Sequence, residues 1–150
     1  MTDSVRQEVV TALDTLFKTI TTANSYNTNL GNNVSWWRSR PLQASELPAL
    51  CLKDTNENRV VAIGQWEHLL TIEAEILVNA SDDGDSMRQA AADVIKVLGT
   101  SLTLGGIAED IRPPGSMESV DVEQDSLRMF GALMSFQVEY YTNPWDPYSP

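Results

Sequence analysis

The sequence predicts an α+β domain in which two helices pack on one face of a mainly antiparallel (mixed) sheet with long strands. Three observations predict this class. Two separate stretches place apolar residues at helical spacing, and two others, 66–79 and 127–141, favour a period of two over an unusual length. Strands outnumber helices and do not alternate with them, which disfavours a parallel sheet built from βαβ units.

The first predicted helix covers residues 4–20. Ser4 and Gln7 fit a capping box, in which the hydroxyl accepts from the Gln7 N–H and the Gln7 side chain reaches back. The apolar residues that follow recur at helical spacing and form one stripe: Val5, Val9, Leu13, Leu16, Phe17 and Ile20.

Short strands are expected next, in a region that is otherwise polar. Residues 34–38 and 48–53 are the candidates, and the second is entered through a proline. Residues 54–58 are polar and Asn-rich, which predicts a turn, and residues 59–63 form a short apolar segment that ends at Gly64.

The clearest strand is predicted at residues 66–79. His68 and the apolar residues occupy one face, whereas Glu67, Glu73 and Glu75 lie on the other. Residues 127–141 form a second long strand with the same period. Such lengths exceed those of ordinary strands, so their ends must be covered by another chain or left as exposed edges.

The remaining elements are shorter. A second helix is expected at 84–98, with acidic residues near its N-terminus where the helix dipole favours them. A strand is expected at 107–111, and Val120 and Val122 alternate weakly. Residues 143–150 contain three prolines and cannot enter a sheet interior, so we expect an extended tail. The chain is therefore divided into one domain, residues 1–142, and a Pro/Trp-rich C-terminal tail, residues 143–150.

The charge restricts the classes of partner. The formal net charge is −11, and residues 61–150 carry fifteen acidic against four basic side chains, whereas residues 1–60 are balanced. This surplus disfavours a grip on nucleic acid phosphates and docking on an anionic membrane. The N-terminus lacks the apolar run of a secretory signal, and no stretch resembles a membrane span, so we expect synthesis in the cytoplasm.

The sequence contains no recognisable catalytic, metal or cofactor site. The single histidine, His68, falls on an apolar strand face, and the single cysteine, Cys51, has no base near it in sequence. Glu73 and Glu75 are two apart on one strand, a spacing typical of solvated carboxylates. The Asp82–Asp85 run lacks the ligand order of a calcium loop and fits a helix start. We therefore expect neither enzymatic activity nor a cofactor.

Aromatic residues and arginines are placed where a core does not need them. Trp, Tyr and Arg are enriched at protein–protein contacts, so we name an interface set from these types: Trp36, Trp37, Arg38, Arg40, Trp145 and Tyr148. The alternative is that one of Trp36 and Trp37 faces the core and the other is incidental. Contacts between copies, with a ring as one way of closing repeated edges, would use this set.

The ordered segments resemble the tail terminator (tail completion) proteins of long-tailed bacteriophages, the minor tail protein U type. The resemblance covers nearly the whole chain up to Thr142. It rests on the order of seven segments: the N-terminal helix ending in Ala23-Asn24-Ser25-Tyr26, Asn29–Trp37, Glu46–Leu52, Trp66–Val78, Arg88–Leu98, Leu104–Asp110 and Val138–Thr142.

The resemblance implies a structural virion protein that forms a ring, typically a hexamer, at the head-proximal end of the tail. Its partners would be copies of itself, the tail tube protein and a head or neck connector protein, with assembly in the host cytoplasm. Genome DNA would pass through the lumen without specific binding, and Glu67, Glu73 and Glu75 are the acidic residues expected to line it. Two alternatives remain: another neck or head–tail joining protein, and a small-ligand-binding or enzymatic α+β domain.

Overall fold

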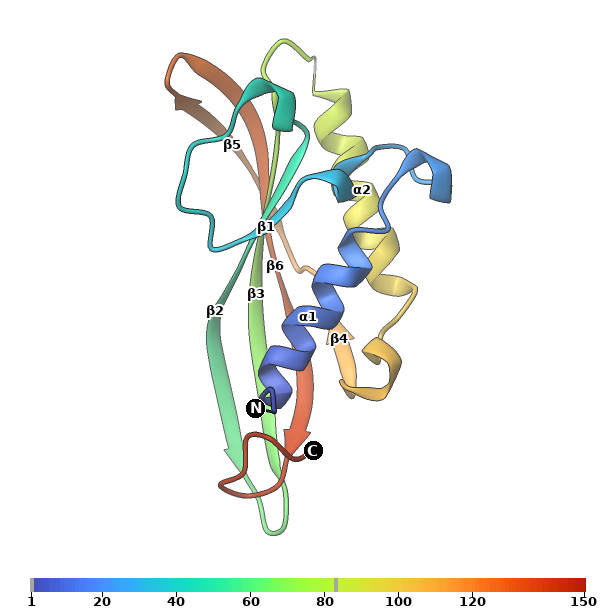
Figure 1. The fold of residues 1–150 in the computed structure, drawn as a ribbon, viewed down its shortest axis with the longest axis vertical. Coiled ribbons are helices and arrows are strands. Elements are labelled where there is room, and N and C mark those ends of the chain that lie inside the picture. The colour runs from blue at the N-terminus through green and yellow to red at the C-terminus, as the bar shows by residue number, and fades with distance from the viewer. Residues whose placement is uncertain (1, 83) are drawn as a thin grey trace.

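The computed structural model describes residues 2–82 and 84–150, and these residues form the predicted α+β fold (Figure 1). Two helices, α1 (Val5–Phe17) and α2 (Asp85–Gly99), lie on one side of a six-stranded mixed sheet in the described part of the chain. The strands are β1 (Val34–Trp36), β2 (Ala49–Val61), β3 (Trp66–Asn79), β4 (Asp110–Arg112), β5 (Met117–Gln124) and β6 (Leu127–Thr142).

The predicted cap starts α1. Ser4 Oγ accepts from the Gln7 N–H at 3.1 Å, whereas the Gln7 side chain turns away and donates to Thr11 Oγ1 at 3.2 Å. The helix ends at Phe17, three residues earlier than predicted, because the Ile20 N–H bonds to the Phe17 carbonyl in a tighter turn. Ile20 is still buried, so the apolar stripe was assigned correctly.

The long strands β2, β3 and β6 form the centre of the sheet. The order is β1-β2-β3-β6-β4, and β5 also pairs with β6. Only β1 and β2 are parallel among the described strand pairs; the other pairs are antiparallel. The strands predicted at 66–79 and 127–141 are confirmed, the second one residue longer.

The turn predicted at residues 54–58 is wrong, because β2 continues through it to Val61. A register shift between Asp54 and Asn56 marks a β-bulge that accommodates one extra residue. The hairpin bend lies later, around Gly64, whose φ of 83° suits glycine. The strand persists because β3 supplies a pairing partner along the whole of β2.

Two smaller predictions also need correction. The strand expected at 107–111 begins only at Asp110, since a short helical turn at Leu104–Gly106 precedes it. The weak alternation near Val120 marks a full strand of eight residues, β5.

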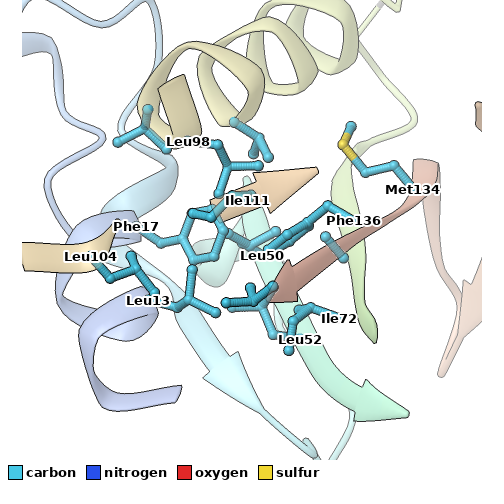
Figure 2. Close-up of a cluster of buried hydrophobic side chains, with 14 of the residues drawn as sticks. Leu13, Phe17, Leu50, Leu52, Ile72, Leu98, Leu104, Ile111, Met134 and Phe136 are labelled. Atoms are coloured by element: carbon cyan, nitrogen blue, oxygen red, sulfur yellow. The ribbon is translucent and has the colours of Figure 1, made fainter. Parts of the chain in front are cut away.

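The core lies between the helices and the sheet. Side chains from α1, α2 and the inner positions of β2, β3 and β6 interlock there (Figure 2). Phe17 and Phe136 meet edge to face at 6.1 Å between ring centroids, which joins α1 to β6.

A second, smaller cluster lies on the helix-free face of the sheet. Residues 37–48 cross this face at one end, where Leu42 packs with Ala49, Leu77 and Met129. The Leu42 N–H donates to Gln124 Oε1 at 3.3 Å. In the described chain we find no other segment packed over this face (Figure 1). No described helix is long and apolar enough to cross a bilayer.

The C-terminal tail is not extended, in contrast to the prediction. The Asn143 N–H donates to the Ser149 carbonyl at 2.8 Å, and Asn143 also forms a bridge with Asp146. The Pro147 carbonyl accepts from the Val5 N–H at 2.8 Å. Residues 143–150 therefore fold back as a closed loop beneath the start of α1, near the β2–β3 bend (Figure 1).

Candidate assembly surfaces

The adjacent tryptophans Trp36 and Trp37 have different surroundings. Trp36 packs against the main core, and its Nε1 donates to Asp14 Oδ1 at 3.2 Å, so it fastens β1 to α1. Trp37 is 57% exposed, with its Nε1 donating to Asp54 Oδ1 at 2.7 Å. The structure therefore leaves Trp37 as the member of the pair with a large free surface.

Arg38 and Arg40 both pair with Glu46. Arg38 binds a Glu46 carboxylate oxygen and also donates to the Arg40 carbonyl at 2.9 Å, while Arg40 Nη1 lies 3.2 Å from Glu46 Oε1. Burial opposes ionisation of Glu46, but the two arginines outweigh it and lower the pKa of this carboxyl. The Arg38 side chain is 16% exposed and that of Arg40 is 67% exposed. Arg38 thus closes the 37–48 segment, and Arg40 keeps most of its surface free.

The tail aromatics lie against the far end of the sheet. Trp145 contacts Trp66 edge to face, with ring centroids 4.8 Å apart, yet it is 87% exposed. Tyr148 is 57% exposed. Both residues keep the surface needed for a contact, but in this structure the tail that carries them packs against the domain of the same chain.

Exposed apolar residues at the β2–β3 bend extend this surface, and the sequence analysis did not single them out. Val60, Val61 and Ile63 are 59%, 68% and 106% exposed. Together with Trp145 and Tyr148 they form an apolar end cluster at one end of the molecule. The sequence predicts a break at Gly64 but indicates a separate short segment at residues 59–63, so it does not reveal that these residues end a long hairpin and are exposed. Exposed apolar groups that gather in this way are typical of interaction sites.

The three expected lumen residues, Glu67, Glu73 and Glu75, lie on the helix-free face of β3, as the alternation predicts. A shared hydrogen bond with Glu139 of β6, together with partial burial and charge repulsion, raises the pKa of Glu67. Burial raises the pKa of Glu75, with a further contribution from Glu73 against an opposing one from Lys53. The face therefore concentrates carboxylates that repel one another.

His68 belongs to a buried polar network on the helix side of the sheet. It is 4% exposed; its Nδ1 accepts from Arg59 Nε at 3.2 Å, so its Nε2 donates to Thr142 Oγ1 at 2.8 Å. Its ring stacks on Tyr140, whose hydroxyl donates to Glu57. Burial lowers the pKa of His68, against the effect of Glu57. Both ring nitrogens are occupied within the fold, which fits a structural role.

The hollow next to His68 is small. It measures about 190 Å³ and lies among Trp66, Trp145 and Pro147. Ligand pockets typically measure ~300–1,000 Å³, so this space gives little support to binding of a metabolite-sized ligand. Residues 2–82 and 84–150 hold no group of three or more His, Cys, Asp or Glu side chains arranged for a metal ion.

No protein-family model matches the chain, and no curated protein matches it in sequence.

Proposed function

We propose that this chain is a tail terminator protein of a long-tailed bacteriophage. Copies form a ring, a hexamer by the family resemblance, on the head-proximal end of the tail tube. The ring ends tube polymerisation and offers the joining surface for the neck or head connector. DNA passes through the lumen, and the protein acts by contact alone.

The observation that carries the proposal is the open, acidic face of the sheet. Helices α1 and α2 cover the other face, whereas Glu67, Glu73, Glu75 and Glu139 lie on the side that, in the described chain, is crossed by the 37–48 segment beside Glu75. A ring that turned this face inward would present carboxylates to the DNA backbone. Like charges would keep the duplex from adhering to the wall, whereas a basic wall would bind it through counterion release.

The remaining exposed aromatic and basic residues supply contacts for the outer parts of such a ring. Trp37, Arg40, Trp145 and Tyr148 keep most of their surface free. Trp36 and Arg38 act mainly within the domain, so we assign them to the support of Trp37 and of the 37–48 segment.

The direct test is imaging of particles from a phage in which this reading frame is deleted. A terminator role predicts overlong tubes or tails that do not join heads. Tails of normal length would contradict termination and would favour a neck protein instead.

The lumen assignment has its own test, based on charge reversal. The double variant Glu73→Lys/Glu75→Lys should still assemble but should slow DNA ejection, because the wall would then attract phosphate. Glu8→Lys on the exposed side of α1 is the matched control and should leave ejection unchanged. Equal ejection rates for the wild type, the double variant and the control would contradict the assignment of the acidic face to the lumen.

A further inference from the structure

Two long edges of the sheet have no neighbour in the described chain. β1 pairs only with Leu50–Leu52, so the outer edge of β2 is free from Asp54 to Val61. On the opposite side of the sheet, β5 (Met117–Gln124) pairs with β6 along one edge and nothing covers the other. Both free segments are eight residues long, roughly 25 Å at the rise of a β-strand.

Backbone groups along the free part of β2 point outward. The Leu50 N–H donates to the Asn33 carbonyl at 2.9 Å, so Leu50 and the residue opposite it, Ile76, do not bond to each other. Even-numbered residues of β3 therefore direct their backbone groups away from β2, so the residues of β2 that lie opposite them after the bulge also do not bond to β3. The N–H and C=O groups of Glu57, Arg59 and Val61 are therefore turned toward the empty side.

The same reasoning defines the free edge of β5. The Glu109 N–H donates to the Glu139 carbonyl at 2.7 Å, so odd-numbered residues of β6 bond toward the β4 and β5 side. Glu118 and Val120 stand opposite Leu133 and Gly131 and use these bonds. The intervening residues must present their backbone groups outward: Met117, Ser119, Asp121 and Glu123.

The exposed charges on the two edges have opposite signs. Along β2 the exposed charged side chains are Lys53 and Arg59. Two half-buried carboxylates lie there as well: Asp54 pairs with Arg6, and Glu57 accepts from the Tyr140 hydroxyl and pairs with Arg59 Nη2 at 3.0 Å. Along β5 the exposed charged side chains are all acidic: Glu118, Asp121 and Glu123.

We propose that the free half of β2 pairs with the β5 edge of a second copy of this chain, so that the sheet continues from subunit to subunit. The proposal rests on the ring suggested above and names its joining surface. Two β5 edges placed together would oppose like charges, which disfavours a symmetric dimer. When two different edges pair, the resulting dimer still has one free edge of each kind. Repetition of this contact closes a ring when the rotation between neighbours is a whole fraction of a turn.

Proline at outward-facing positions tests the pairing without disturbing the subunit. Ser119→Pro and Val61→Pro each remove an outward N–H, while the ladders to β6 and β3 keep their bonds. Ser119→Ala and Val61→Thr are the matched controls. Sedimentation equilibrium of the full chain over a wide concentration range measures self-association, and circular dichroism checks the fold.

We expect the wild type to associate, each proline variant to weaken association by about tenfold or more, and the controls to stay near wild type. If a proline variant does not fold, Glu123→Lys serves instead, because it changes the edge charge and keeps the backbone. It should weaken association at low salt, and Glu8→Lys should not.

A wild type that stays monomeric, or proline and charge variants that associate as the wild type does, would overturn edge pairing. The deletion phage decides the terminator role separately. Overlong tubes in the deletion phage, together with proline variants that associate normally, would refute edge pairing and support the terminator role. Tails of normal length, together with association that the proline variants weaken, would refute the terminator role and support edge pairing.

Discussion

Asp54 joins three parts of the chain at the start of the free edge of β2, and its replacement by asparagine is our main prediction. Its carboxylate accepts from Arg6 Nε at 3.0 Å, Arg6 Nη2 at 2.7 Å and Trp37 Nε1 at 2.7 Å. The Asp54 side chain is 18% exposed and that of Arg6 is 39% exposed. Asp54→Asn keeps an acceptor for Trp37 but removes the charge that binds Arg6.

The expected loss of unfolding free energy at pH 7 is about 1–2 kcal/mol. Hydrogen bonds to charged groups contribute about 1.5–3 kcal/mol, and the exposure of Arg6 reduces this through solvent screening. Urea unfolding of the wild type and Asp54→Asn gives the difference. Asp110→Asn, at an exposed strand position, is the control and should change stability by less than about 0.5 kcal/mol.

The same pair of proteins should differ in their response to acid. Burial opposes ionisation of Asp54, but the hydrogen bonds from Trp37 and Arg6 outweigh it and lower its pKa below the usual 3.8. A carboxyl with a lowered pKa stabilises the fold above its unfolded pKa, and this stabilisation is lost as the pH falls through the folded value. The gap between wild type and Asp54→Asn should therefore narrow below about pH 4. A gap of constant size from neutral to acid pH would refute the ion pair as its cause.

Three further predictions concern other parts of the chain. In Gly31→Ala the new Cβ would lie 2.6 Å from the Lys18 carbonyl oxygen, which no rotamer can relieve, so thermal unfolding should show a loss of about 2–3 kcal/mol in unfolding free energy. The control Gly99→Ala, at a helical position with open space around it, should raise the unfolding free energy by about 0.5–1 kcal/mol. Equal effects of the two substitutions would contradict the close approach at Gly31. Because burial lowers the pKa of His68, its neutral form stabilises the fold above the unfolded pKa near 6.5, and this stabilisation is lost as the pH falls below that value. The unfolding free energy of His68→Gln, measured with urea, should therefore depend less steeply on pH below about 6.5 than that of the wild type, and an equal dependence would count against this role of His68. Trp145→Ala should lower the unfolding free energy by less than about 1 kcal/mol, because the main contact of Trp145 is one edge-to-face contact with Trp66. The same variant should weaken self-association in sedimentation experiments. Unchanged association would show that the tail is not part of the interface.

The sequence was sufficient for the elements whose period is long and regular. The alternation from Trp66 to Asn79 identified a buried and an open face, and the Ser4 cap located the start of α1. These features depend on residues close together in sequence. For the same reason the open-face placement of Glu67, Glu73 and Glu75 followed directly from the strand.

The features that the sequence did not reveal depend on partners distant along the chain. Asp93 of α2 is buried because it accepts from the Asn27 N–H and from both the N–H and hydroxyl of Thr28. The tail folds back because the Val5 N–H offers the Pro147 carbonyl a partner at 2.8 Å. Neither pairing leaves a periodic pattern, so the sequence did not single out Asp93 and predicted an extended tail.

The bulge in β2 explains how a turn-like sequence can supply both a buried network and a free edge. Without the extra residue, continued alternation from Leu52 and Asp54 would turn Asn56 and Asn58 toward the helices. The shift instead brings Glu57 and Arg59 to that side, where they meet Tyr140 and His68.

Glu57 is half-buried and pairs with Arg59 Nη2 at 3.0 Å, so the exposed member of this ion pair at the free edge is the guanidinium of Arg59. The polar composition that resembles a turn thus occurs in a strand that pairs with β3 on one side and leaves its other edge free. An apolar sequence at this position would leave an unprotected edge prone to unspecific aggregation. A polar edge with a defined charge can select a partner edge of opposite charge, which is the property that subunit-to-subunit pairing requires.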